Sequence, residues 1–141
     1  MNPLCITWAP AEWSQIGRRN LDKFTYSGYF TIAALHDGFV HRKLCRLGFE
    51  YLGQPFAPFI YGQKAFPYHI ANQLNIKLIM YGENGEVEYG GDMKNAYIPN
   101  RTVKDYSKHY FSNIPPNKWL DYDISHKDIN PFIGPDDKYI E

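Results

Sequence analysis

The sequence has few cysteines and no long apolar run. Its 141 residues include two cysteines, Cys5 and Cys45, and each lies within an apolar stretch. Thiols in such surroundings are typical of reduced core residues and not of a disulfide framework. No apolar run has the length of a membrane span, and the N-terminus lacks the charged-then-apolar pattern of a signal peptide. We therefore expect a cytoplasmic protein with no membrane insertion.

The sequence also lacks an excess of charge of either sign. Lys plus Arg (15) balances Asp plus Glu (15), so we expect no bulk positive field and no nucleic-acid partner. The histidines His36, His109 and His126 have no metal-ligand spacing with either cysteine, which argues against a zinc site. Aromatic residues, in contrast, make up 17% of the chain. This content favours a folded protein with concave, partly polar pockets.

Short apolar runs alternate with helical patterns through the first two thirds of the chain. Strands are predicted at 4–8, 29–35, 59–61 and 78–81, and helices at 11–23, at 39–52 and from Pro67 to Asn75. Asp37 is placed to cap the second helix and Gly53 to end it. This alternation predicts an α/β fold, with a parallel, Rossmann-like sheet that carries helices on both faces.

The pattern changes near residue 92. Residues 92–141 are rich in Tyr, Asn and Pro and show no sustained period, apart from short helices predicted near 105–110 and 117–121. We therefore divide the chain into an α/β domain over 1–91 and an irregular segment over 92–141.

Polar residues lie at the carboxyl ends of three of the predicted strands. They form the groups Thr7-Trp8, Gly62-Gln63-Lys64 and Gly82-Glu83-Asn84. In open parallel sheets, ligands bind outside the carboxyl ends of the strands. The three groups are therefore the candidate ligand-facing residues.

Five blocks of the sequence carry a resemblance to a known family. They are "NPLCITWAP", "GRRNLDKFTYSGY", "DGFVHRKLCRLGFE", "PFIYGQKAFPYHIA" and "IMYGENGEVEYGG", in this order between residues 2 and 91. Together they resemble the N-acetyl sugar amidotransferases, which are PP-loop ATP pyrophosphatases of bacterial lipopolysaccharide and flagellin glycan biosynthesis. Five blocks in order are far more specific than any one of them.

The resemblance implies an activity. Family members use ATP and Mg²⁺ to activate the acetamido group of a nucleotide-activated N-acetyl sugar, and ammonia from a glutaminase subunit converts it to an acetamidino group. The protein then has to hold the triphosphate, orient the amide and exclude water.

One departure from the family is central. The Ser-Gly-Gly-x-Asp-Ser loop that binds pyrophosphate after the first, central strand occurs nowhere in the 141 residues. We therefore expect the chain to be a fragment that lacks the first strand. Without that neighbour, the strands at 4–8 and 59–61 would each have an unpaired edge. We also expect that the chain alone does not cleave ATP. The catalytic residues are not identified.

The resemblance assigns roles to the nucleotide-facing groups. Lys64 and Gln63, with Gly62, would contact the α-phosphate or ribose, and Thr7 and Trp8 would meet adenine. The alternatives are a solvated helix N-terminus for Gln63 and Lys64 and simple packing for Trp8.

The acidic group after residue 82 has two readings. Glu83 and Glu88, with Glu86 nearby, could hold Mg²⁺, or Glu83 and Asn84 could bind sugar hydroxyls. The alternative is an acidic hairpin that turns at Asn84-Gly85.

A third candidate group lies on the helix at 39–52. His41 and Arg42, with Arg46, could reach the sugar-nucleotide diphosphate from the polar side of this helix. The alternative pairs Arg46 with Glu50 on an exposed face.

Other functions remain open. A PP-loop enzyme acting on tRNA is disfavoured by the neutral charge and by the absence of cysteine-pair motifs. A non-catalytic remnant, a subunit completed by a separately encoded N-terminal piece, and a glycan-binding module are the alternatives to an amidotransferase fragment.

Overall fold

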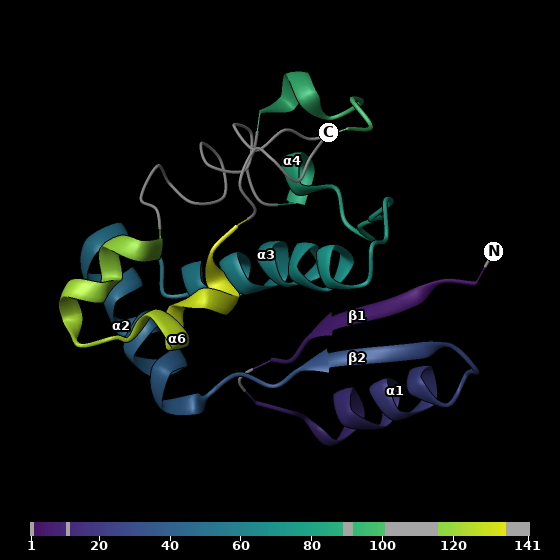
Figure 1. Cartoon of the computed structure of the whole chain (residues 1–141), viewed down its shortest axis with the longest axis horizontal. Helices are drawn as coiled ribbons and strands as arrows, with labels where there is room; N and C mark the ends of the chain where they lie inside the picture. Colours follow the sequence, from purple (N-terminus) through teal and green to yellow (C-terminus); the bar gives the residue numbers. More distant parts are fainter. Residues whose placement is uncertain (1, 11, 89–91, 101–115, 135–141) are drawn as a thin grey trace.

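The computed structural model describes residues 2–10, 12–88, 92–100 and 116–134, and it has an α/β architecture. Helices surround one small parallel sheet (Figure 1). The elements are, in chain order, β1 (Leu4–Trp8), α1 (Gln15–Thr25), β2 (Phe30–Ala34), α2 (Gly38–Leu52), α3 (Ala57–Gln73), α4 (Gly85–Glu88), and then the 3-10 helix η1 (Met93–Asn95), the 3-10 helix η3 (Pro116–Tyr122), α6 (His126–Ile129) and the 3-10 helix η4 (Asn130–Phe132).

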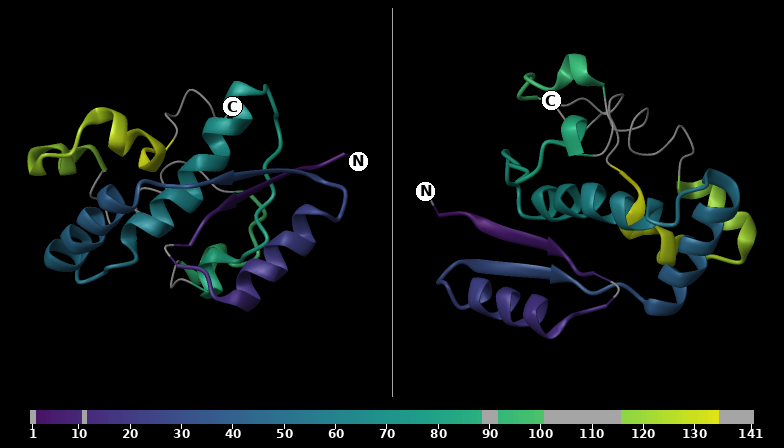
Figure 2. Two further views of the ribbon diagram at one scale, coloured as in Figure 1. Left: turned by 90° about the horizontal axis from the view of Figure 1, so that it is seen from below. Right: turned by 180° about the vertical axis from the view of Figure 1, so that it is seen from behind.

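The N-terminal β1–α1–β2 unit agrees with the sequence pattern. β1 and β2 pair in parallel, with Leu4 opposite Phe30 and Trp8 opposite Ala34. The helix between them begins after Ser14, whose Oγ accepts a hydrogen bond from the Gly17 amide at 3.0 Å. α1 lies on the β2 side of the two strands and α3 on the β1 side, in the front view and from behind (Figures 1 and 2). Both predicted strands are confirmed to within a residue, and the predicted helix is confirmed with its start shifted, although residue 11 is outside the described residues.

The ends of α2 are as predicted. Asp37 Oδ1 accepts hydrogen bonds from the amides of Phe39 (2.7 Å) and Val40 (3.1 Å), which have no carbonyl partner within the helix. Gly53 ends the helix with φ of 65°, a left-handed conformation that glycine adopts without a Cβ clash.

The predicted strand at 59–61 is wrong, because these residues lie inside α3. Pro58 stands in the first turn of this helix, where its missing N–H costs nothing, and the helix continues through Gly62, Gln63 and Lys64. Pro67, which was predicted to start a helix, lies in its interior. The helix ends before Asn75, which takes a positive φ of 54°.

The predicted strand at 78–81 is also not formed. These residues form no regular element, and they do not pair with either described strand. The alternative hairpin at Asn84-Gly85 is wrong as well, because Gly85–Glu88 forms α4. With 59–61 helical, β1 is the one of the two strands expected to have an unpaired edge that forms, and β2 also has one edge without a strand partner among the described residues. Because the described sheet has two strands, β1 pairs with β2 on one edge only.

One hydrophobic core joins the sheet to the last described segment. Its largest members come from β1, α2, α3, η3, α6 and η4: Trp8, Leu44, Tyr61, Trp119, Ile129 and Phe132. The 3-10 helix η3 confirms the short helix predicted near 117–121, whereas the one predicted at 105–110 falls outside the described residues. The division of the chain at residue 91 stays a prediction, although residues 116–134 pack into the core of the preceding part. In the described part of the chain, no helix combines the length and the apolar character needed to cross a membrane.

The Asp37 cap gives a direct test of this fold. We expect Asp37→Ala to lower the free energy of unfolding by about 1 kcal/mol, because two amides of the first turn of α2 lose their acceptor. Urea denaturation would measure the loss. Glu50→Ala, on the exposed side of the same helix, is the control and should change stability by about 0.5 kcal/mol or less. Equal effects of the two substitutions would contradict the capping role.

Candidate functional site

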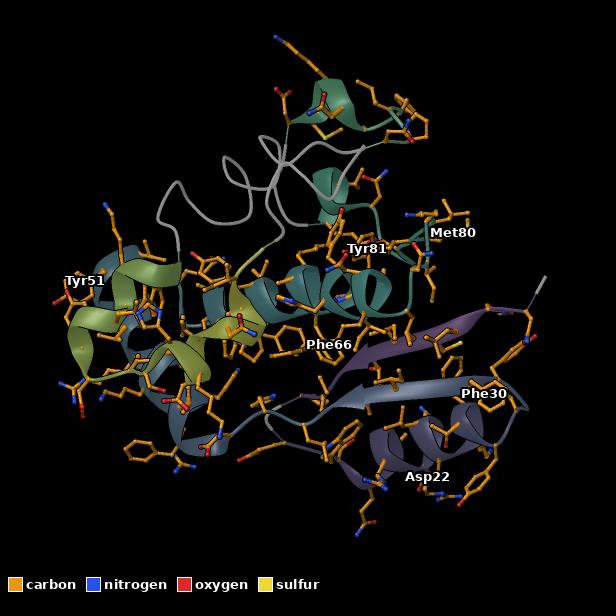
Figure 3. All side chains as sticks on the ribbon, viewed as in Figure 1. Asp22, Phe30, Tyr51, Phe66, Met80 and Tyr81 are labelled. Atoms are coloured by element: carbon orange, nitrogen blue, oxygen red, sulfur yellow. The ribbon has the colours of Figure 1, made fainter. Side chains whose placement is uncertain are left out.

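A cavity of about 790 Å³ lies between β1, α3 and residues 76–83. Four of the predicted site residues line it: Thr7, Trp8, Gln63 and Glu83. Phe66, which also lines the cavity, projects from α3 toward the strands (Figure 3). Among the lining residues Glu83 is the one charged side chain, and most others are apolar. The cavity is therefore an apolar trough with a polar end.

The polar end is built around an ion pair between the buried Lys64 and the partly exposed Glu83. Gln63 Nε2 donates to Glu83 Oε1 at 2.6 Å, and the other carboxylate oxygen of Glu83 lies 3.5 Å from Lys64 Nζ. The Lys64 ammonium also sits over the ring of Tyr81, 4.6 Å from its centroid, and Tyr81 Oη donates to the Lys64 carbonyl at 3.0 Å. These contacts fasten residues 81–83 to the middle of α3.

Lys64 does not take the position predicted for it. Only 3% of the residue is exposed, and its ammonium faces the Glu83 carboxylate. It therefore neither lies at a solvated helix N-terminus nor presents a free charge to a phosphate in the cavity. The helical path of α3 explains the difference, because it turns Lys64 away from the trough and toward residue 83.

Gln63 has an available acceptor at the polar end, as does Glu83, whose Oε2 also accepts no hydrogen bond from the described residues. The side-chain nitrogen of Gln63 is used by Glu83, while its Oε1 is buried and accepts no hydrogen bond from the described residues. A buried acceptor of this kind is costly unless a partner satisfies it. An N–H or O–H group of a ligand in the cavity would be such a partner.

Gly62 has a packing role. A Cβ at position 62 would lie 2.1 Å from Cζ2 of Trp8, far inside van der Waals contact. The absence of a side chain therefore lets the Trp8 indole lie against the backbone of α3. Gly62 was predicted to contact a nucleotide, but the structure places the indole at this position.

Trp8 is surrounded by aromatic rings. It stacks on His36 with centroids 5.6 Å apart, and it also meets Phe66 and Phe132. It is 7% exposed, and its Nε1 has no hydrogen-bond partner among the described residues. Packing accounts for most of its surroundings, and Thr7 is the half-buried residue that borders the cavity at this strand end.

His41 is buried, so its placement on the polar side of α2 is wrong. Its ring lies 4.1 Å from that of His36, and Cys45 Sγ lies 3.6 Å from His41 Nδ1. Burial, aided by repulsion from His36, lowers the pKa of His41 to about 4, and burial raises the pKa of Cys45. His41 is therefore neutral near pH 7 and does not supply a positive charge to a diphosphate.

The remaining basic residues of α2 do not reach the cavity either. Arg42 is exposed and does not line it. Arg46 Nε donates to Glu50 Oε1 at 2.6 Å, which confirms the exposed pairing considered for it.

The acidic residues after position 82 are engaged with the protein. Glu83 binds Gln63 and Lys64, while Glu88 Oε1 accepts from the Asn84 amide at 3.0 Å. Asn84 Nδ2 donates to the Ala96 carbonyl at 3.1 Å, so its amide group links the start of α4 to the residue that follows η1. Within the described ranges, no group of three or more His, Cys, Asp or Glu side chains is arranged to hold a metal ion. The Mg²⁺ assignment to Glu83 and Glu88 stays a prediction.

Comparison with known proteins gives no family assignment. No protein-family model matches the sequence, and no curated protein is significantly similar to it.

Sequence reasoning missed the His36–His41 contact and the role of Tyr81. His36 follows β2 directly and was considered only as a metal ligand, although a polar residue at a strand end was itself a usable signal. Tyr81 was read as the last residue of a strand. Its contact with Lys64 depends on the helical path of α3, which the sequence pattern did not predict.

The interaction between Lys64 and Glu83 can be tested by measuring how their substitutions combine in the free energy of unfolding. We expect Glu83→Gln to destabilise the protein by roughly 2 kcal/mol, because Lys64 stays buried after losing its carboxylate partner. Adding Lys64→Met should recover part of this loss, since the buried charge is then removed. Urea denaturation of the two single variants and the double variant measures the coupling. Additive losses would show that the two side chains do not interact.

The buried histidine predicts acid sensitivity. The pKa of His41 is about 4 in the folded chain and 6.5 in the reference state, so the unfolded state binds more protons between these values. Stability should be complete above pH 6.5 and decline as the pH falls toward 4, by at most about 3 kcal/mol from this residue. Thermal unfolding of His41→Gln should show a weaker pH dependence than the parent chain. His126→Gln, at an exposed position, is the control and should retain the full dependence.

Proposed function

We propose that the chain is part of an ATP-dependent N-acetyl sugar amidotransferase, and that it forms one wall of the site for a nucleotide-activated N-acetyl sugar. The observation that carries this proposal is the convergence of Thr7, Gln63 and Glu83 on one cavity. These residues come from three of the sequence blocks that resemble the family, and they lie far apart in the chain. Residues that share a ligand have to converge in this way.

The finer fold assignment belongs to the same proposal. A parallel β1–α1–β2 unit is the building block of Rossmann-like sheets, and the cavity runs along β1 and includes its carboxyl end. Both features support a PP-loop-like domain without its first strand. Cytoplasmic location, ammonia supply by a glutaminase subunit and a role in surface-glycan synthesis follow from the resemblance.

The chemistry of the cavity favours neutral hydrogen-bonding groups over phosphates. Gln63 Oε1 is an available acceptor, whereas the one cation close to the polar end, Lys64, is buried against Glu83. An acetamido N–H, a sugar hydroxyl or an adenine amino group could donate to Gln63. The residues present do not fit a triphosphate with Mg²⁺, because no free cation and no cluster of carboxylates faces this cavity in the described part. We therefore derive no ATP-dependent step for this chain alone.

A subunit completed by another polypeptide is the second candidate. The observation that favours it is the edge of β1 that has no strand partner among the described residues. In this alternative, the phosphate-binding loop is supplied by the other polypeptide and the present chain contributes the sugar-facing wall.

Binding of UDP-N-acetylglucosamine, measured by isothermal titration calorimetry, tests the proposal. We expect saturable binding that Gln63→Ala weakens on the order of tenfold, the equivalent of about one buried hydrogen bond. Gln73→Ala is the matched control, since Gln73 is an exposed glutamine of the same helix, and it should bind as the parent chain does. No saturable binding, or equal effects of the two substitutions, would refute the sugar site.

ATP–pyrophosphate exchange tests the expectation that the chain alone does not cleave ATP. The chain alone should not exchange labelled pyrophosphate into ATP, because the Ser-Gly-Gly-x-Asp-Ser motif that binds pyrophosphate in the family is absent from its sequence. Exchange above the background of a heat-denatured sample would show that another part of the chain binds the phosphates.

A further inference from the structure

The buried indole of Trp8 carries a hydrogen-bond donor without an acceptor. Trp8 is 7% exposed, and its Nε1 has no partner among the described residues. His36 does not supply one, because its ring stacks on the indole at 16° and covers the ring face, whereas the N–H points along the ring plane. Phe66 and Phe132, which also contact the indole, have no side-chain acceptor. A buried donor of this kind is costly unless a partner satisfies it.

An unpaired acceptor is carried by the neighbouring part of α3. Cε2 of Trp8, the ring carbon bonded to Nε1, is one of the atoms that a Cβ on Gly62 would strike. This packing brings the donor beside residue 62, and the next residue, Gln63, has the buried, unpaired acceptor Oε1. Both Trp8 and Gln63 line the cavity. The cavity is therefore bordered by an unpaired donor from β1 and an unpaired acceptor from α3.

The cavity is unsuited to a charged ligand. The Glu83 carboxylate at its polar end disfavours an anion, while the buried Lys64 ammonium, 3.5 Å from that carboxylate, balances its charge and disfavours a cation. The other described walls are mainly apolar and include Leu4, Ile6, Phe66, Ile70, Ile76 and Leu78. A ligand that fills the cavity is therefore neutral and largely apolar.

A secondary amide satisfies both unpaired groups. Its carbonyl oxygen accepts from Trp8 Nε1, and its N–H donates to Gln63 Oε1. These two amide groups point in opposite directions, which fits partners from two different elements, whereas a hydroxyl has to use one oxygen for both. At about 790 Å³, the cavity has the size of pockets that enclose whole drug-sized ligands, so an acetyl group on the amide would leave most of it empty.

We propose that the cavity binds a neutral N-acyl compound, with its secondary amide at the polar end and a medium-length apolar acyl chain along the trough. The chain then covers the apolar side chains of Leu4 and Ile6 on β1 and of Leu78 opposite them. Such a site involves no sugar and no ATP step, so it goes beyond the proposed function and does not depend on it.

N-methylhexanamide is the first probe, and its binding to the whole chain can be followed by NMR. The chain has three tryptophans, so the indole N–H of Trp8 is identified by its loss in Trp8→Phe, and those of Trp13 and Trp119 are internal controls. The probe should shift the Trp8 resonance saturably and leave the two controls in place. No saturable binding, or a Trp8 resonance that does not move at saturation, would overturn the proposal.

Methyl hexanoate has the same chain and carbonyl but no N–H. It should bind on the order of tenfold more weakly than the amide, because Gln63 Oε1 stays unpaired. Adsorption to an apolar surface would instead favour the ester, which interacts less with water. Equal or tighter binding of the ester would therefore overturn the proposal. So would equal binding of 1-heptanol, because the site would then be one for a hydroxyl.

Two variants assign the two hydrogen bonds. In Gln63→Leu the preference for the amide over the ester should disappear, since the acceptor is gone, whereas Gln73→Ala, at an exposed glutamine of the same helix, should keep it. Trp8→Phe should weaken both probes to a similar degree, because both have the carbonyl. An unchanged preference in Gln63→Leu would overturn the proposal, and this comparison does not require Trp8→Phe to fold.

The length of the acyl chain tests the apolar part of the cavity. Each methylene added between N-methylacetamide and N-methylhexanamide should tighten binding by about fourfold, because it enters apolar surroundings. Leu78→Lys should reduce this gain, whereas Phe39→Lys, at a residue of α2 that is equally exposed (68%) and does not line the cavity, should not. Affinity that does not change with chain length, or equal effects of the two substitutions, would overturn the proposal.

The titration with UDP-N-acetylglucosamine is a separate measurement. Binding of the sugar nucleotide without binding of N-methylhexanamide would refute the acyl site alone. Binding of N-methylhexanamide without the sugar nucleotide would refute the sugar site alone.

Discussion

The relative placement of β1, α3 and the C-terminal core depends on one contact, the packing of the Trp8 indole against the backbone of Gly62. The indole can lie there only because position 62 has no Cβ. From this position Trp8 also stacks on His36 after β2 and meets Phe132 of η4, so one side chain links both strands, α3 and the C-terminal core. Glycine inside a helix costs about 1 kcal/mol relative to alanine, and here the close approach of β1 to α3 offsets that cost. The distance between β1 and α3, and with it the base of the cavity, follows from this contact.

The elements with strong local signals were predictable from the sequence. β1 and β2 are short β-favouring runs, and α2 has an aspartate cap and a terminal glycine. The first and last residues of each element can therefore be predicted from its own segment of the sequence. α3 has weaker signals, because Gly62 followed by Gln63 and Lys64 is a typical end of a strand. The structure uses these residues differently: Gly62 receives Trp8, and Lys64 is buried by pairing with Glu83. Tertiary contacts therefore override the local sequence pattern of α3. A prediction made for one segment at a time does not include such contacts.

The candidate site was predictable in its members but not in its geometry. Gln63 and Glu83 were both expected to face a ligand, and both line the cavity. Their contact with each other, and the inward turn of Lys64, require the helical path of α3 and could not be read from the spacing. His41 was misplaced for a related reason. Its position on α2 seemed polar by residue type, whereas the ring lies beside His36 in an environment that lowers the pKa of His41 to about 4.

The cavity has an apolar length and a polar end. Leu4 and Ile6 border it toward the start of β1, while Thr7, Gln63 and Glu83 gather near the carboxyl end of this strand. The Lys64–Glu83 pair leaves no free cation facing the described part of the cavity. The polar end therefore suits a group that donates a hydrogen bond to Gln63, and the rest of the cavity suits apolar surface.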